Sequence, residues 1–348
     1  MPTQGLARLW TTPLDAKGVD AKASEVVKSL RLCYTLVYPN ERFTMDLGLC
    51  CMFSGDMHKQ IRYRTTTVKV CAALSDTDRV AKIDDIVLSN VTSLRDSVQF
   101  CVDNDINCFR ISSDLFPLAT HADLGYHIAS LPSADAIYRT LSDTKQLAQA
   151  NGVRLLFHPD QFCVLSSPKP EVIASTVKEL DFHAQIAVLV GADALIIHGG
   201  GAYGDKPSAL QRFAENFRLL SDDAQRMLVV ENDDRTYTVD DLLPLCQTID
   251  IPLVYDVHHH RCNQDSLSVE DATTQALSTW TDGRTPLFHI SSPRDGWDAK
   301  NPRPHHDFID INDFPQFWLD LDVHVEVEAK SKQEAVLQLA DQLKAVRS

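Results

Sequence analysis

The feature that most limits the fold of this 348-residue chain is a regular order of short apolar runs and longer amphipathic segments, which starts near Met45. Short apolar runs are typical of buried strands, and longer runs with a 3.6-residue period are typical of helices. The expected strands are Asp46–Met52, Asn107–Ile111, Arg154–Phe157, Ala194–Ile197, Met227–Val230, Leu253–Tyr255, Pro286–His289 and Val323–Val327. The expected helices are Ile83–Cys101, Ala134–Ala150, Pro170–Val190, Ser208–Leu220, Val239–Thr248, Val269–Thr279, Ile311–Leu319 and Lys332–Val346.

Eight strands that each precede a helix match the count of a closed (β/α)8 barrel, the TIM barrel. A doubly wound open sheet is the alternative, but no glycine-rich dinucleotide-binding motif follows the first strand. No internal repeat or low-complexity linker divides the chain, so we expect one barrel domain over residues 44–348. Residues 1–43 are expected to form an N-terminal extension, in which Val26–Leu32 has a weak helical pattern.

The net charge of −15 argues against non-specific nucleic-acid binding by the whole surface, although it leaves a local basic cleft open. The sequence contains no apolar run of membrane-spanning length, and its start lacks the apolar core of a signal peptide. Nine cysteines without a CxxC pair favour buried free thiols in a reducing compartment. We therefore expect a cytoplasmic protein with no membrane contact and no obligate protein partner.

The sixth expected strand ends in an unusual group of polar residues. In the run IPLVYDVHHHR, Asp256 is followed by His258, His259 and His260. A carboxylate with imidazoles three and four residues later is a plausible ligand set for zinc, manganese or iron. The alternative is a helix N-cap aspartate followed by solvated histidines, and this run alone does not decide between them.

Similar residues end most of the other strands. Because the carboxyl ends of all strands in a TIM barrel meet on one face, they would surround one pocket. The residues are His158, His198, Glu231, Asp256, His259, His289 and Glu328, with His121, His305 and His306 in nearby loops. Each could be structural on its own, but their recurrence predicts two or three divalent ions. No serine nucleophile motif accompanies them, so the chemistry favours metal-assisted hydrolysis or sugar isomerisation.

A basic segment contrasts with the acidic composition. Lys59, Arg62, Arg64 and Lys69 follow the first strand, in a loop on the same face as the predicted metals. Further basic residues lie in later loops of that face: Arg261, Arg294, Lys300 and Arg303. Such side chains could contact the phosphates of a nucleic acid, or they could be ordinary solvated loop charges.

With these residues assembled, the chain resembles the UV damage endonucleases of the UvdE type from about Asp46 to Lys332. The motifs that carry the resemblance are FRISSDLFP, HPDQF, the run from His198 to Lys206, ENDD, DVHHH, HISSP and EAK. The resemblance implies a TIM barrel related to endonuclease IV. It also implies cleavage of damaged double-stranded DNA on the 5′ side of a lesion, which leaves a 3′-hydroxyl and a 5′-phosphate. Up to three divalent ions, commonly manganese, would be the cofactors, and the protein would associate with the nucleoid when bound to DNA.

The resemblance also implies roles for individual residues. Glu231, His289 and Glu328 would be catalytic, with Glu231 bridging the metals. The implied metal ligands are His121, His158, His198, Glu231, Asp256, His259, His289, His305 and Glu328, with His306 in place of His305 if the loop shifts by one residue. Gln161 and Phe162 match a pair that wedges into the duplex beside the lesion. The implied DNA contacts are Gln161, Phe162, Arg62, Arg64, Lys69 and Arg303.

Two positions depart from the family pattern. Leu49 replaces a tyrosine of some members, and Leu287 replaces a lysine that is carboxylated in the family. The first change bears on lesion recognition, and the second removes a group near the metals. A xylose-isomerase-like enzyme and a non-catalytic damage-binding protein are the alternative functions.

Overall fold

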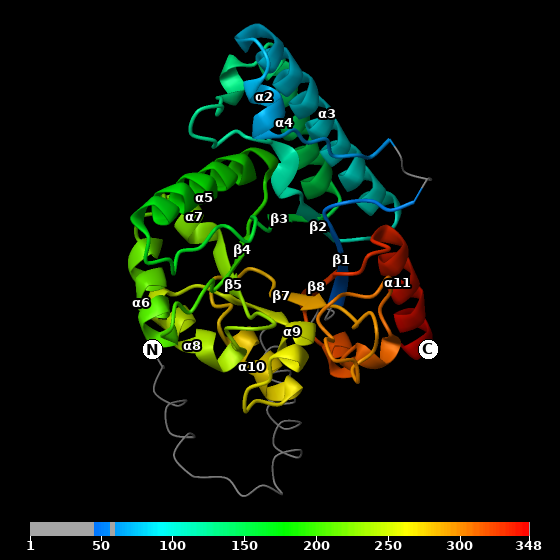
Figure 1. Cartoon of the computed structure of the whole chain (residues 1–348). Helices are drawn as coiled ribbons and strands as arrows, with labels where there is room; N and C mark the ends of the chain where they lie inside the picture. The colour runs from blue at the N-terminus through cyan, green and yellow to red at the C-terminus, as the bar shows by residue number, and fades with distance from the viewer. Residues whose placement is uncertain (1–44, 56–59, 348) are drawn as a thin grey trace, which may run out of the picture. The chain divides into compact units, whose positions relative to one another are not determined.

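The computed structural model describes residues 45–55 and 60–347. Within these residues, eight parallel strands form a closed barrel in which each strand pairs with the next and β8 pairs with β1 (Figure 1). The strands are β1 Met45–Cys50, β2 Cys108–Ile111, β3 Arg154–Phe157, β4 Leu195–His198, β5 Leu228–Glu231, β6 Leu253–Asp256, β7 Leu287–Ile290 and β8 Val323–Val327. The prediction of a (β/α)8 barrel is confirmed. The expectations for residues 1–43 and for Lys59 lie outside the described residues.

Helices surround the strands (Figure 1). They are α2 Val68–Ala72, α3 Asp76–Asp103, α4 Ala134–Ala150, α5 Pro170–Val190, α6 Lys206–Phe217, α7 Asp222–Met227, α8 Val239–Ile249, α9 Val257–Cys262, α10 Val269–Ser278 and α11 Gln333–Arg347. Local sequence explains their ends, as α5 illustrates. This helix starts at Pro170, which needs no hydrogen-bond acceptor for its nitrogen. It ends at Val190, and the next residue, Gly191, is the C-cap, with a left-handed φ of 76°. No described helix is both long and apolar enough to cross a membrane.

The barrel interior has an apolar layer below a polar one. Buried apolar side chains from six of the strands form a separate inner cluster, which includes Cys108, Leu156, Ile196, Val229, Val254 and Leu287. Successive side chains of a strand point to opposite faces. The residue two positions after each of these apolar residues, in the strand or directly after it, therefore also points inward. Those residues are Arg110, His158, His198, Glu231, Asp256 and His289. The strand pattern therefore brings polar groups to the carboxyl end of the barrel.

Some expected boundaries were wrong. The segment Ile311–Leu319 is not one helix but two 3-10 turns, η3 Ile311–Asp313 and η4 Gln316–Asp320. Pro315 lies between them, and a proline disfavours helical backbone in the residue before it. β1 ends at Cys50 rather than Met52, because Cys51 has a φ of 59° and leaves the strand conformation.

Three short helices were not expected. α2 starts after Thr67, whose side chain accepts a hydrogen bond from the amide of Val70. α7 starts after Ser221, whose side chain accepts a hydrogen bond from the amide of Ala224. α9 starts directly after β6, at the histidine run. Other helix and strand ends differ from the expected ones by a few residues, the largest difference being the earlier start of α3 at Asp76.

Candidate metal centre

Glu231 lies at the centre of the polar layer. It is the last residue of β5 and is 1% exposed. Its Oε1 lies 3.0 Å from Nδ1 of His289 and 3.2 Å from Nδ1 of His259. Its Oε2 lies 2.9 Å from Nε2 of His158 and 3.8 Å from Nε2 of His198. One carboxylate thus faces four imidazoles that come from four other strands or their ends.

Asp256 is compatible with both interpretations that the sequence left open. It is the N-cap of α9, and its Oδ1 accepts a hydrogen bond from the amide of His259 at 2.7 Å. Its Oδ2 is buried and makes no hydrogen bond with the part of the chain that the structure describes. That oxygen lies 3.5 Å from Nδ1 of His259 and 4.0 Å from Nδ1 of His289. A buried carboxylate oxygen without a hydrogen bond is costly, and a bound cation would offset that cost.

The neighbouring histidines are not solvated. His258 is fully buried, and its Nε2 lies 3.2 Å from the carbonyl oxygen of Arg303. His260 is also buried, and its Nδ1 lies 2.6 Å from the hydroxyl of Tyr255. The alternative of solvated loop histidines after the N-cap is therefore wrong. These two side chains anchor α9 and leave His259 facing Glu231.

The donor atoms fit divalent cations. Nδ1 of His158 lies 3.2 Å from the carbonyl oxygen of Pro159, and Nδ1 of His259 lies 2.9 Å from that of Asn232. If Nδ1 of His158 donates a hydrogen to its carbonyl, Nε2 of that ring, which faces Glu231 at 2.9 Å, keeps a lone pair for a metal. In His259 it is Nδ1 that also faces Glu231 and Asp256, at 3.2 and 3.5 Å. Among the described residues, the ligand atoms form two groups with spacing suited to an ion: His158, His198 and Glu231, and Glu231, Asp256 and His259. Both groups contain Glu231, so its carboxylate could bridge two ions.

The charges in this cluster are strongly coupled. Burial raises the pKa of Glu231, but the surrounding imidazoles, His289 first, hold that pKa well below its usual range. Burial lowers the pKa of His289, but the charge of Glu231 outweighs burial and raises that pKa to about 10. The Glu231 carboxylate therefore stays ionised. Cations that bind here must displace protons from imidazoles, which makes the affinity for metal depend on pH.

Glu328 joins the cluster from the residue after β8. Its Oε1 lies 2.6 Å from Nη1 of Arg110 and 3.4 Å from Nδ1 of His289. Its Oε2 lies 3.8 Å from Nδ1 of His305, which is held beside β7 by a backbone bridge to Pro293. The structure thus brings His289, His305 and Glu328 to the same side of the barrel mouth.

Two of the histidines considered as ligands lie apart from Glu231. Nδ1 of His121 accepts hydrogen bonds from the amides of Asp123 and Leu124, at 3.1 and 3.2 Å. His121 lines a different cavity, and no contact joins it to the Glu231 cluster within the described ranges. Nδ1 of His306 accepts a hydrogen bond from the amide of Phe308, and its side chain is exposed.

Comparison with known proteins identifies the family. The family model UV-endonuclease UvdE matches residues 45–348. A UV DNA damage endonuclease of Bacillus velezensis is 32% identical over 318 residues, which cover 88% of this chain and 95% of that protein. The chain belongs to the UvdE family of UV endonucleases.

Solved structures agree with this assignment. The crystal structure of SacUVDE covers 87% of this chain and 99% of its own, with a TM-score of 0.76 and 28% identity. Endonuclease IV from Thermus thermophilus covers 86% and 98%, with a TM-score of 0.54 and 15% identity, and shares the fold. As a UvdE protein, the chain is a DNA repair endonuclease, and its family relationship removes the sugar-isomerase and non-catalytic alternatives.

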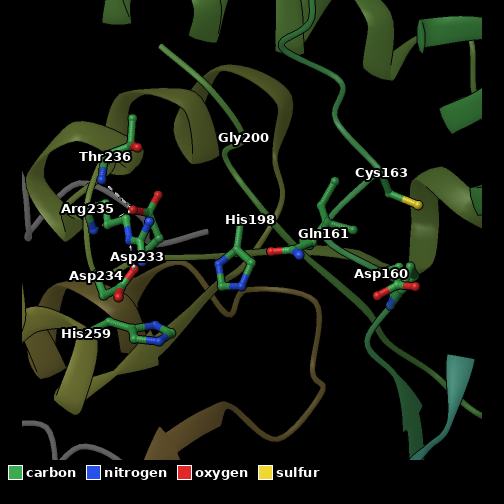
Figure 2. A pocket seen from close by; sticks show the side chains of 12 residues that line it. Asp160, Gln161, Cys163, His198, Gly200, Asp233, Asp234, Arg235, Thr236 and His259 are labelled. Carbon is green, nitrogen blue, oxygen red and sulfur yellow. Dashed lines mark hydrogen bonds and ion pairs between the residues drawn. The ribbon is translucent and has the colours of Figure 1, made fainter. Parts of the chain in front are cut away.

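The candidate wedge residues of this UvdE protein lie beside the cluster. Gln161 lines a cavity of about 410 Å³ with His198, Asp233 and His259, and its side chain points towards His198 (Figure 2). Phe162 is 76% exposed and lines a neighbouring cavity of about 670 Å³, which also contains His121. Phe162 has the largest exposed fraction of the large hydrophobic side chains in the described residues.

The candidate phosphate contacts are of two kinds. Arg62 and Lys69 are exposed and form no ion pair with described residues. Arg64 pairs with Asp85 at 2.8 Å, and Arg303 pairs with Asp234 at 3.3 Å. The charge of the paired arginines is already partly neutralised, so Arg62 and Lys69 are the stronger candidates.

Sequence reasoning missed Arg110 on β2 and Glu326 on β8. Both are buried and lie against His289. The signal was present for Glu326, because in the strand VHVEV this residue lies two positions before Glu328 and therefore shares its face.

The two positions that depart from the family pattern are both buried. Leu49 is fully buried in the main core, and Leu287 belongs to the inner apolar layer.

Proposed function

We propose that this endonuclease cuts one strand of a damaged DNA duplex on the 5′ side of the lesion and leaves a 3′-hydroxyl and a 5′-phosphate. We further propose that cleavage requires two or three divalent ions, with Mn²⁺ as the preferred metal. The observation that carries the proposal is the position of Glu231, whose two carboxylate oxygens face four histidines at the mouth of the barrel.

Manganese suits the donor set. The two candidate ligand groups contain only imidazoles and carboxylates, and no cysteine thiolate. Imidazole and carboxylate ligands favour Mn²⁺, Fe²⁺ or Zn²⁺, while thiolates would have favoured Zn²⁺ or Cu⁺. Divalent ions held here would activate the scissile phosphodiester and the attacking water.

The residues of the chain divide the work of holding these ions. Glu231 would bridge ions, with His158 and His198 on the side of its Oε2. Asp256, His289 and Glu328 would complete the site on the side of its Oε1. His259 and His305 would hold a further ion, since their rings lie 6.5 Å apart at the outer side of the cluster. His121 stays a proposed ligand only if its loop moves towards His158 on binding.

Recognition of the lesion is proposed for the wedge residues. Phe162 would stack against a base while the damaged nucleotides rotate out of the duplex, and Gln161 would contact the exposed strand. Arg62, Lys69, Arg64 and Arg303 would contact phosphates and position the duplex over the cluster.

The test uses a 5′-labelled duplex that carries a single cyclobutane pyrimidine dimer, incubated with purified protein and Mn²⁺. We expect one nick on the 5′ side of the dimer, and the product should be extended by a DNA polymerase because it ends in a 3′-hydroxyl. The same duplex without a dimer is the control and should stay intact. Cleavage without added metal in the presence of EDTA, or equal cleavage of the control, would contradict the proposal. Binding of the lesion without any nick would do so as well.

A further inference from the structure

Glu326 is a buried carboxylate that the proposed ligand set does not use. It belongs to β8 and lies two residues before Glu328, so both side chains point into the barrel. The register of β7 and β8 places Glu326 directly beside His289. Its Oε2 lies 2.8 Å from Nε2 of His289, and both residues are 0% exposed.

Arg110 neutralises this carboxylate. Its Nε donates to Oε1 of Glu326 at 3.0 Å, and its Nη2 donates to Oε2 at 2.8 Å. Its Nη1 lies 2.6 Å from Oε1 of Glu328. Oε1 of Glu326 also lies 3.7 Å from the thiol of Cys50, which can donate to it. A buried charge pair is tolerated only when its hydrogen bonds are satisfied in this way.

The contacts of Glu326 give the two nitrogens of His289 different roles. Nδ1 faces the proposed metal ligands, at 3.0 Å from Glu231 and 3.4 Å from Glu328. Nε2 faces Glu326 and also lies 3.0 Å from Nη2 of Arg110. If Nε2 accepted a hydrogen from Arg110, its lone pair would lie 2.8 Å from a carboxylate oxygen, which is repulsive. A hydrogen on Nε2 that is donated to Glu326 avoids this repulsion. The proton that a bound cation displaces is then the one on Nδ1, and the lone pair of that nitrogen faces the ion.

We propose that Glu326 and Arg110 are positioning residues: Glu326 fixes the tautomer and ring orientation of His289, and Arg110 fixes Glu328, so that both ligands face the same ion. Carboxylates that accept a hydrogen bond from a metal-binding histidine commonly orient it in this manner. The inference rests on the proposed metal dependence and goes further, since it assigns a role to two buried side chains outside the proposed ligand set.

The test measures metal binding directly, because a change in nicking alone would not separate positioning from catalysis. Mn²⁺ is titrated into metal-free protein and the free ion is followed by electron paramagnetic resonance, which gives the number of sites and their affinities. We expect Glu326→Gln to weaken one Mn²⁺ site by about 10- to 100-fold and to leave the remaining sites unchanged. The melting temperature in EDTA is recorded for each variant.

A matched control comes from the opposite end of the barrel. Arg154 and Asp193 form an ion pair at 2.9 Å at the start of β3, away from the cluster. Asp193→Asn removes a carboxylate from an arginine without changing the mouth, so it should leave every Mn²⁺ affinity at the wild-type value.

A further variant separates positioning from simple core stability. In Arg110→Met/Glu326→Met, apolar side chains of similar length replace the buried pair, a change that often preserves or raises stability. If this variant melts like wild type but still binds one ion weakly, positioning is supported. Wild-type Mn²⁺ affinity in this variant or in Glu326→Gln overturns the inference while leaving the proposed function intact. Wild-type protein that binds no Mn²⁺ overturns both.

Discussion

Glu231 lies at the centre of the candidate metal site, where it faces four histidines. A carboxylate that is 1% exposed would ordinarily be protonated, because burial disfavours its charge. Here the imidazoles of four histidines outweigh burial and hold its pKa well below the usual range. The charge is thus available at the barrel mouth, where it can bridge ions.

Replacement of Glu231 by glutamine tests this role. The side chain keeps its shape but loses the charge and one of the two oxygens that could bind ions. We expect nicking of the dimer-containing duplex to fall by at least about 10³-fold, which corresponds to about 4 kcal/mol in activation free energy. The rate is measured with labelled duplex at saturating Mn²⁺. Glu215→Gln, at an exposed position of α6, is the control and should keep the wild-type rate. Wild-type nicking by Glu231→Gln would exclude the bridging role.

His324 carries a prediction about pH and stability. It lies on β8, paired with Leu287 on β7, is 9% exposed and has an Nδ1 without a hydrogen bond in the described structure. Burial, aided by the charge of Arg154, lowers its pKa from 6.5 to about 3. In the unfolded chain the imidazole is protonated below pH 6.5, while in the folded protein it stays neutral. The unfolded state then binds more protons, so stability falls as the pH drops from about 6.5 towards about 3.

The size of this effect follows from the same values. At about pH 5, protonation of His324 in the unfolded chain should lower the free energy of unfolding by about 2 kcal/mol relative to neutral pH. His324→Leu removes this titration. Between about pH 7.5 and about pH 5, the variant should therefore lose about 2 kcal/mol less stability than the wild type. Urea unfolding of metal-free protein at both pH values measures the difference. Equal losses for wild type and variant would show that His324 is not held neutral.

At the scale of elements, the strands could be predicted and several connections could not. A buried strand depends on a local run of apolar residues, and the step of two residues along it then assigns the inward face. This local rule was enough to place His158, His198, Glu231 and His289 at one mouth. The pair of Glu326 with His289 depends instead on the register of β8 against β7, which the sequence does not state.

Connections depend on longer-range packing. His121 follows β2 in a turn where its Nδ1 accepts hydrogen bonds from two backbone amides. Sequence order alone could not show that this turn holds His121 away from Glu231. The residues of α9 read as the end of a strand, because the helix has only six residues and no amphipathic repeat. Its start could be anticipated only from Asp256 as an N-cap.

Asp256 joins an element boundary to the site, and two substitutions separate these roles. Asn is as good an N-cap as Asp, whereas Ala cannot accept the hydrogen bond from the amide of His259. Both substitutions remove the carboxylate charge beside His289. We therefore expect Asp256→Asn and Asp256→Ala to lose nicking to a similar extent.

Stability should distinguish the two variants. Asp256→Ala should be less stable than Asp256→Asn by about 1 kcal/mol, the usual cost of a lost N-cap. Urea unfolding in EDTA gives the free energies, and the dimer-containing duplex gives the activities. If Asp256→Asn retained full nicking, Asp256 would be a cap and not a ligand. Equal stability of the two variants would show that the N-cap hydrogen bond of Asp256 does not stabilise α9.

At the scale of the whole molecule, charge opposes DNA binding. With a net charge of −15 the protein repels a polyanion at long range, so affinity must come from a few local contacts. The candidates differ in how free their charge is. Arg62 is exposed without an ion pair to described residues, while Arg64 pairs with Asp85 at 2.8 Å.

This difference leads to a prediction about salt. Each phosphate contact releases counterions, so the logarithm of the binding constant falls with the logarithm of salt concentration by about 0.9 per contact. Arg62→Ala should weaken binding of damaged and undamaged duplex alike and reduce this slope by about 1. Arg64→Ala, close to it in the chain, is the matched comparison and should change the slope by less, because its guanidinium already has a carboxylate partner. Fluorescence anisotropy with a labelled duplex over a series of NaCl concentrations, with Ca²⁺ in place of Mn²⁺ to limit cleavage, measures both slopes. An unchanged slope for Arg62→Ala would place the phosphate contacts elsewhere on the barrel mouth.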